Sequence, residues 1–200
     1  YKVAIVQDAA YAALVHGRKP LSILATEGAM DVAIELHSLS KSYNMTGWRI
    51  GWVCGNQGLV QAFAEVKDHS DSGQFAAIQK AAAVGLRNPQ LTEEIARKYE
   101  RKLKLLCEAF AKLGFETEMP EGTFYLFMKS PKGIEGGQEF TSAEACSQWL
   151  IREHLISTVP EDTAGPYLRA GATFIARDEE DEKRIADEIG NRLSGSKFVF

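Results

Sequence analysis

Short continuous runs of apolar residues open this chain of 200 residues, and longer periodic segments follow them. The runs at residues 3–6, 32–36 and 50–53 predict three strands, the first of them buried on both faces of a sheet. The link between the second and third runs is too short for a helical crossover. The third strand is therefore expected to be antiparallel to the second or to lie at the sheet edge.

Helical spacing replaces these runs after Asn56, which is placed to cap a helix. Residues 74–86 are rich in alanine and predict a second helix that can pack closely against its neighbours. A longer amphipathic pattern starts at residue 92 and ends at Gly114, a glycine that predicts a C-terminal cap. Together with the strands, these patterns predict helices packed on a mixed, mainly parallel sheet.

From residue 115 onward short strands and helices alternate, which is typical of an α+β domain. The expected strands are 115–118, 124–128, 155–159 and 167–174, and the expected helices are 141–154 and 178–193. The predicted fold class is therefore α/β, with part of a mixed, mainly parallel sheet over residues 1–95. A smaller α+β domain is expected over residues 96–200.

The composition argues against several kinds of partner. Hydrophobic residues make up 45% of the chain, charged residues 25%, and the formal net charge is -4, which does not favour nucleic acid or an anionic membrane. No apolar run approaches the roughly 18 residues of a membrane helix. With no basic-then-apolar leader either, we expect a cytoplasmic protein. Cys54, Cys107 and Cys146 are widely spaced, and they predict neither disulfides nor a metal site.

The segment 38–51 carries the candidate chemistry, because it joins two predicted strands and contains hydroxyls and cations but no acidic residue. Loops at strand ends are where α/β proteins bind ligands. Five residues at or just after strand ends form the candidate set: Asp8, Tyr11, Ser38, Lys41 and Arg49. Taken singly, each has an ordinary explanation as a surface cation or a turn-capping side chain. Their joint occurrence favours a binding site.

These residue types match what pyridoxal phosphate chemistry requires. A lysine forms the Schiff base, a carboxylate keeps the ring nitrogen protonated, and a phenol hydrogen-bonds the ring oxygen. A hydroxyl and a guanidinium hold the phosphate, since arginine donates two parallel hydrogen bonds to its oxygens. Once substrate replaces the lysine, its free amine can remove the proton from the substrate Cα.

The sequence Ser-Leu-Ser-Lys-Ser-Tyr-Asn-Met-Thr-Gly-Trp-Arg-Ile-Gly at 38–51 resembles the pyridoxal-phosphate attachment segment of class I aminotransferases, the aspartate aminotransferase family. Asp-Ala-Ala-Tyr at 8–11 resembles that family's preceding Asp-x-x-Tyr. By this resemblance Lys41 is the catalytic Schiff-base lysine and proton shuttle, Asp8 the partner of the ring nitrogen, Tyr11 the donor to the ring oxygen, and Ser38 and Arg49 the phosphate ligands.

Two later segments extend the resemblance. Glu-Gly-Thr-Phe-Tyr at 121–125 is similar to the family's glycine-plus-aromatic strand, and Pro-Tyr-Leu-Arg at 166–169 resembles the segment that clamps the substrate α-carboxylate. The resemblance implies that Arg169 binds substrate. The preceding loop at 159–165 departs from the family, because it lacks the frequent Pro-Gly-Ser-x-Phe-Gly pattern.

The resemblance covers essentially all 200 residues, yet only the C-terminal half of a family member. It implies an aminotransferase that acts on amino-acid and 2-oxo-acid substrates and is homodimeric when complete. The LL-diaminopimelate and aspartate aminotransferase-like branches are the most similar. This chain alone is expected to hold the cofactor poorly and to be inactive. Two alternatives stay open: a pyridoxal-phosphate-dependent lyase of the same fold, and a non-catalytic regulatory or binding domain.

Overall fold

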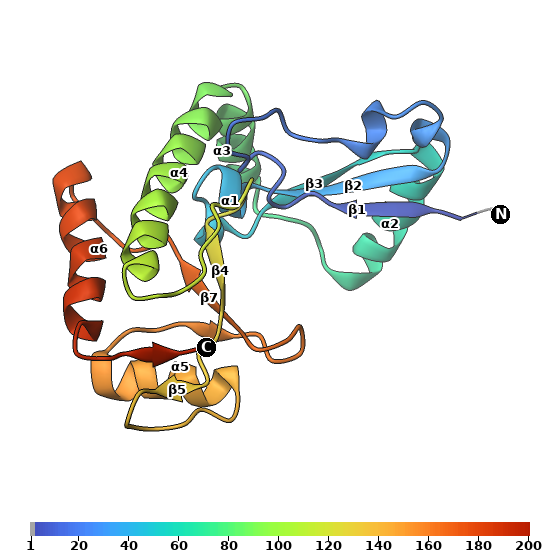
Figure 1. The fold of residues 1–200 in the computed structure, drawn as a ribbon. Helices are drawn as coiled ribbons and strands as arrows, with labels where there is room; N and C mark the ends of the chain where they lie inside the picture. Colours follow the sequence, from blue (N-terminus) through green and yellow to red (C-terminus); the bar gives the residue numbers. More distant parts are fainter. Residues whose placement is uncertain (1–2) are drawn as a thin grey trace. The chain divides into compact units, whose positions relative to one another are not determined.

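The structure is a computed structural model that describes residues 3–200 (Figure 1). The chain divides into two compact units, of which the first ends at Arg97 and the second begins at Lys98. The assignment of residues 1–95 and 96–200 to a large and a small domain stays a prediction.

The first unit combines a three-stranded sheet with helices that follow it in sequence. Its elements are β1 (Ile5–Asp8), the 3-10 turns η1 (Ile23–Ala25) and η2 (Ala29–Asp31), β2 (Ala33–Ser38), α1 (Leu39–Ser42), η3 (Thr46–Trp48), β3 (Gly51–Gly55), α2 (Gln57–Ser70) and α3 (Ala76–Leu86). The helix α4 (Gln90–Ala111) begins in this unit and continues into the second.

The strand order is β1-β2-β3, with β1 parallel and β3 antiparallel to β2. The predicted antiparallel return is thus confirmed. The expectation that the first run is buried on both faces is wrong, since Val3 is 63% and Val6 is 57% exposed. The physical reason is that, among residues 3–200, too little of the chain packs over the side chains of this edge strand to exclude water from them.

The third strand returns very close to the end of the second, where Gly51 pairs with Ser38. A Cβ atom at Gly51 would lie 2.4 Å from the carbonyl oxygen of His37. Real Cβ contacts are not that short, so the glycine of the Arg-Ile-Gly sequence is required by the close approach of two backbones. Helix α2 then starts at the predicted cap, since Asn56 Oδ1 accepts a hydrogen bond from Leu59 N at 3.0 Å.

The second unit contains two small sheets and the helices α5 and α6, besides the end of α4. Its elements after α4 are β4 (Tyr125–Lys129), β5 (Gly133–Ile134), α5 (Ala143–His154), β6 (Val159–Pro160), β7 (Tyr167–Gly171), α6 (Glu179–Leu193) and β8 (Phe198–Val199). The strands pair antiparallel in the orders β4-β7-β6 and β5-β8.

The sheet β4-β7-β6 has two different faces because side chains alternate along a strand. Leu126 and Met128 of β4 and Leu168 and Ala170 of β7 are buried in the core of the unit. The residues between them, Arg169 among them, are half-buried or exposed and form the other face. A polar site can therefore be built on this sheet without entering the core.

The predicted strand at 115–118 is wrong, because those residues pair with no strand. Phe115 is buried by aromatic packing instead, with ring centroids 5.3 Å from Phe110 and 4.9 Å from Phe198. A loop that buries one aromatic side chain next to exposed polar residues has the same sequence pattern as a short, half-buried strand. The glycine at the end of α4 does adopt a left-handed conformation, with φ 89° at Gly114.

An ion pair links α4 to α6, which lie side by side (Figure 1). The guanidinium of Arg101 donates from Nε and Nη2 to the two carboxylate oxygens of Glu182, at 2.7 and 3.1 Å. The pair is bidentate and its carboxylate side chain is only 2% exposed, so removal of either partner would leave a poorly solvated charge. Within residues 3–200 no helix is long and apolar enough to cross a membrane.

We expect Gly51→Ala to lower the urea midpoint of unfolding, because the new methyl group would overlap the His37 carbonyl. Overpacking of this kind costs roughly 1–3 kcal/mol. Gly47→Ala is the matched control, since nothing lies within 4 Å of a Cβ at that position. Equal midpoints for the two variants, measured by far-UV circular dichroism, would contradict the close approach.

Candidate functional site

The carboxyl ends of β1 and β2 meet at one edge of the first sheet. In the parallel register Asp8 is opposite Leu36, and Ala9 N donates to Leu36 O at 2.8 Å. Asp8 and Ser38 therefore end two adjacent strands at the same edge, as predicted. Asp8 Oδ1 accepts a hydrogen bond from Ala10 N at 3.1 Å, so this exposed carboxylate also stabilises the turn that follows.

Lys41 lies in α1, a single helical turn where the sequence predicted a loop. The turn forms because Ser38 caps it, with Oγ accepting from Ser40 N at 3.1 Å, and because Leu39 is fully buried beneath it. The Nζ atom of Lys41 is 5.6 Å from the centre of the Tyr11 ring. The structure thus brings the predicted lysine and phenol together.

Arg49 follows η3 in a left-handed conformation, with φ 51° and ψ 55°. For a residue with a side chain this costs about 1–2 kcal/mol. Its own guanidinium compensates by bonding back to the turn, where Nη1 donates to Thr46 O at 2.8 Å and to Ser40 Oγ at 3.4 Å. Backbone strain held in place by a charged side chain is typical of functional sites.

Ser40 connects the predicted anion-binding residues, and sequence reasoning missed it. Its backbone N–H donates to Ser38 Oγ, and its hydroxyl accepts from Arg49. The two predicted phosphate ligands are therefore joined through Ser40 rather than directly. The signal in the sequence was the second hydroxyl of Ser-Leu-Ser-Lys, directly before the lysine.

The donor set fits pyridoxal phosphate. The hydrogen bonds of Arg49 go to a carbonyl and a hydroxyl, both neutral, so its positive charge stays available for an anion. The serine hydroxyls beside it can donate to the same anion. At the same edge of the sheet, the exposed carboxylate of Asp8 is suited to a protonated ring nitrogen.

Arg169 lies on β7 in the second unit, on the face of the sheet turned away from the core. Its guanidinium carbon is 4.5 Å from the centre of the Tyr125 ring, and Nη1 is 3.1 Å from Glu161 Oε1. Its Nε atom is buried and has no hydrogen-bond partner among the described residues. Because buried N–H groups are rarely left unpaired, this atom indicates an acceptor such as a ligand carboxylate.

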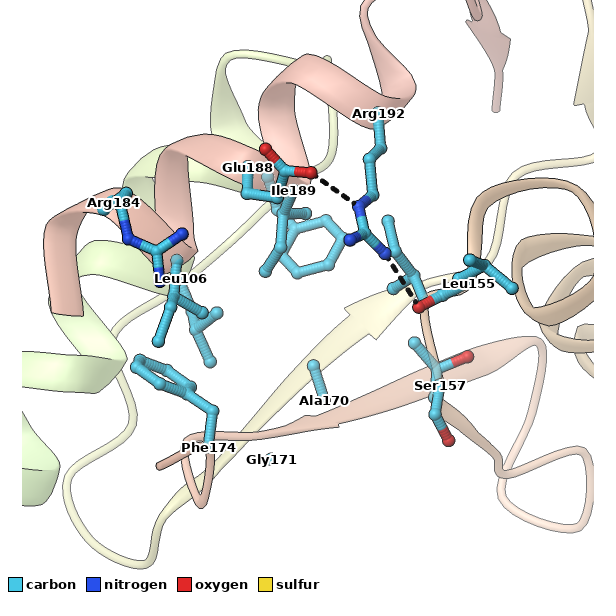
Figure 2. Close-up of a pocket in the computed structure, with 14 residues that line it drawn as sticks. Leu106, Leu155, Ser157, Ala170, Gly171, Phe174, Arg184, Glu188, Ile189 and Arg192 are labelled. Carbon is cyan, nitrogen blue, oxygen red and sulfur yellow. Dashed lines mark hydrogen bonds and ion pairs between the residues drawn. The ribbon is translucent and has the colours of Figure 1, made fainter. Parts of the chain in front are cut away.

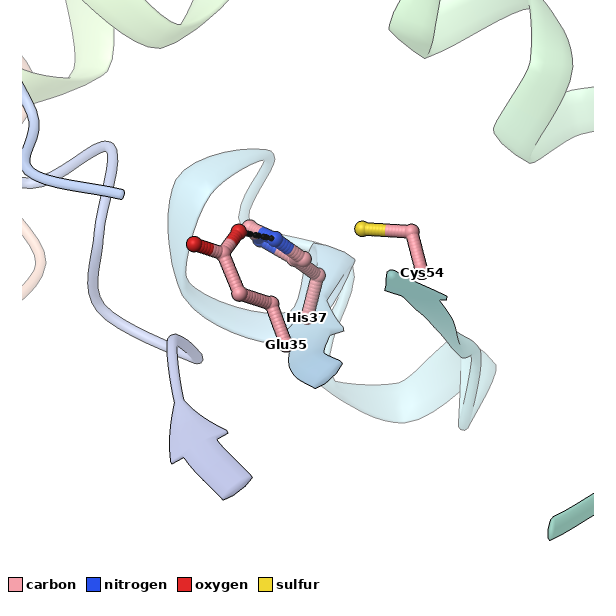
Figure 3. Close-up of side chains that lie close together, drawn as sticks. All are labelled: Glu35, His37 and Cys54. Atoms are coloured by element: carbon pink, nitrogen blue, oxygen red, sulfur yellow. Dashed lines mark hydrogen bonds and ion pairs between the residues drawn. The ribbon is translucent and has the colours of Figure 1, made fainter. Parts of the chain in front are cut away.

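A second polar cluster, formed by Glu35, His37 and Cys54, lies on β2 and β3 (Figure 3). Glu35 Oε2 is 2.8 Å from His37 Nε2. Burial acts to raise the pKa of Glu35, but hydrogen bonds from Ser22, His37 and a backbone N–H outweigh it and leave the pKa lowered. Burial and then this charge raise the pKa of the Cys54 thiol. The Glu35 carboxylate is thus hydrogen-bonded and the Cys54 thiol stays protonated, so the cluster is explained as part of the packing of the sheet.

The second unit also contains a cavity of about 400 Å³ between α4, α6 and β7 (Figure 2). Leu106, Phe174 and Ile189 are among the apolar side chains that line it. Ala170 lines it too and alternates with Arg169, so the cavity lies on the opposite face of β7 from the guanidinium. It is separate from the predicted substrate site.

The structure is similar to aminotransferases of known structure. Substrate-bound BacF from Bacillus subtilis matches with a TM-score of 0.85 and 28% identity, over 98% of this chain and 48% of that one. An aminotransferase from Staphylococcus aureus matches with a TM-score of 0.82 and 29% identity, over 97% and 50% of the two chains. These neighbours confirm the predicted fold class, that of pyridoxal-phosphate-dependent transferases.

The sequence comparisons agree. LL-diaminopimelate aminotransferases of Methanococcus maripaludis and Methanocaldococcus jannaschii are 49% and 48% identical, over 98% and 100% of this chain. The glutamate-pyruvate aminotransferase AlaC of Escherichia coli is 36% identical over 100% of it. The chain spans about half the length of these relatives, 48%, 49% and 47% respectively.

The model of the family "aminotransferase class I and II" matches residues 1–181. The chain belongs to this family, whose members are pyridoxal-phosphate-dependent transferases. The family predicted from residues 38–51 is thereby confirmed.

Proposed function

We propose that this chain supplies the cofactor-attachment side of an aminotransferase that moves an amino group between an amino acid and a 2-oxo acid. One observation carries the proposal: Lys41 lies beside Tyr11 at the end of β2, next to the hydrogen-bonded group of Ser38, Ser40 and Arg49. Family membership and the names of the relatives support the reaction class.

Lys41, Asp8 and Tyr11 would each contact a different part of the cofactor. Lys41 would hold pyridoxal phosphate covalently through Nζ and, when released, would move the proton at the substrate Cα. Asp8 would keep the ring nitrogen protonated, and Tyr11 would donate a hydrogen bond to the ring oxygen. When bound, the cofactor supplies an electron sink for negative charge at the substrate Cα.

The phosphate would be held by Ser38, Ser40 and Arg49. Arg49 is already oriented by Thr46 O, so little side-chain entropy remains to be lost when an anion binds. The hydrogen bonds of Ser40 with Ser38 and with Arg49 keep the hydroxyls and the guanidinium in one group.

Arg169 would bind the α-carboxylate of the substrate. The unpaired Nε atom supports this assignment, and so does the aromatic ring of Tyr125 under the guanidinium. A guanidinium that binds a carboxylate through Nε and Nη2 donates two parallel hydrogen bonds to it. These bonds fix the orientation of the carboxylate and therefore of the substrate Cα–H bond.

We propose LL-diaminopimelate as amino donor, with aspartate as a second candidate donor, and a 2-oxo acid as acceptor. The donor is supported by two relatives named LL-diaminopimelate aminotransferase at 49% and 48% identity. A homodimeric assembly, a cytoplasmic location and the division into a large cofactor domain and a small domain remain predictions. So does the inactivity of this chain alone.

The attachment of the cofactor to Lys41 can be tested by chemical labelling. In the complete protein, borohydride reduction with pyridoxal phosphate should fix the cofactor on the peptide that contains Lys41, as found by mass spectrometry. Lys41→Ala should lower amino transfer by about 10²–10⁴-fold or more, because it removes both attachment and proton transfer. Lys80→Ala, at an exposed position of α3, is the control that should keep activity.

The outcomes separate the alternatives. Label on another lysine, or none at all, would refute the assignment and favour a non-catalytic domain. Label on Lys41 with release of pyruvate and ammonia, but no glutamate formed from 2-oxoglutarate, would indicate a lyase instead of an aminotransferase.

The role of Arg49 at the phosphate can be tested by substitution. Arg49→Lys should weaken pyridoxal phosphate binding about tenfold, because an ammonium group cannot donate the two parallel hydrogen bonds of a guanidinium. Absorbance titration of the complete protein measures the affinity. Arg87→Lys, at the exposed C-terminus of α3, is the matched control and should bind normally. Equal affinity in both variants would exclude Arg49 from the phosphate site.

A further inference from the structure

Glu161 is the residue that contacts the guanidinium of Arg169 most directly, and neither the resemblance nor the relatives assign it a role. Nη1 of Arg169 and Oε1 of Glu161 are 3.1 Å apart. The two side chains are 33% and 24% exposed, so the pair is partly shielded from water. An exposed pair of this kind would contribute little, but a shielded one can fix the orientation of both groups.

The guanidinium has two edges that can bind a carboxylate, and Glu161 occupies neither of them fully. It contacts Nη1, whereas the side-on edge is formed by Nε and Nη2. Nε on that edge is buried and unpaired among the described residues. The Nε donor is therefore left without a protein acceptor while the guanidinium itself is held.

The backbone around Glu161 is held from two directions. Glu161 N donates to Tyr167 O at 2.9 Å, which continues the pairing of β6 with β7. The next residue, Asp162, accepts from the first two N–H groups of α5, Ala143 and Glu144, at 2.8 and 2.9 Å. Because the loop is fixed at both strand and helix, the backbone of Glu161 is held in one position relative to β7.

The ring of Tyr125 supports the guanidinium from its flat side, 4.5 Å from the guanidinium carbon. A flat support restricts tilt but still allows rotation in the plane of the ring. The contact between Glu161 and Nη1 removes that remaining freedom. Free arginine side chains have about 2 kcal/mol of rotamer entropy to lose, so a preset orientation favours binding.

We propose that Glu161 is a positioning residue that holds Arg169 by Nη1 and leaves its Nε–Nη2 edge unpaired for the α-carboxylate of the substrate. The inference rests on the proposed function, since it takes Arg169 as the substrate-binding arginine. It also assigns a role to the loop at 159–165, which departs from the usual pattern of the family.

The test is steady-state kinetics of the complete protein with 2-oxoglutarate and its amino donor. Glu161→Ala should raise KM about tenfold for donor and acceptor alike, because both carry the same carboxylate, with kcat changed less than about threefold. Glu161→Gln keeps an acceptor oxygen and should restore most of the affinity. Glu135→Ala, which removes a carboxylate from the exposed pair with Lys197, is the matched control and should leave KM unchanged.

A double-mutant cycle shows whether Glu161 acts through Arg169. Arg169→Ala should raise KM about a hundredfold, and Glu161→Ala should add nothing in that background. An unchanged or lowered KM in Glu161→Ala, or a full effect in the Arg169→Ala background, would overturn the inference while leaving the proposed function intact. If Arg169→Ala itself leaves KM unchanged, the substrate-binding role of Arg169 fails instead.

Discussion

The parallel pairing of β1 with β2 determines the geometry of the candidate cofactor site. Its register sets Asp8 opposite Leu36, so both strands deliver polar residues to one edge. The antiparallel return of β3 then pairs Gly51 with Ser38. The segment between these two residues is thereby pinned at both ends, and its lysine and arginine have little freedom to leave the edge. A side chain at position 51 would push β3 away from the end of β2. The same glycine therefore affects both the stability of the sheet and the shape of the site.

Most elements of the fold could be predicted from local patterns, because periodicity and caps are local properties. The cap at Asn56 and the alternation of strands and helices after residue 115 are examples. The failures arose where the outcome depends on distant parts of the chain. The apolar run at 3–6 shows that a strand is present but not what covers it. Phe115 is buried by rings from elsewhere in the second unit, and residues 115–118 pair with no strand.

The site was predicted residue by residue from a sequence motif, but its internal contacts were not. The motif marks Ser38, Lys41 and Arg49 as candidates by their resemblance to a family segment, whereas the hydrogen bond of Ser40 with Arg49 depends on a left-handed turn nine residues later. The contact of Glu161 with Arg169 is harder to predict, because the two residues are eight positions apart in the sequence. They come together only because β6 and β7 pair antiparallel. Hydrogen-bond partners of this kind are properties of the folded backbone.

The two arginines differ in their surroundings in a way that suits the two anions proposed for them. Arg49 contacts only neutral oxygens among its hydrogen-bond partners, so it offers a full positive charge to a resident dianion. Arg169 is partly neutralised by Glu161 and offers mainly geometry. A substrate carboxylate must bind and leave in every turnover, and binding that is too tight in the ground state does not accelerate the reaction. Glu161 brings a negative charge close to this site, but in the proposal the benefit of a fixed guanidinium orientation exceeds the attraction that this charge removes.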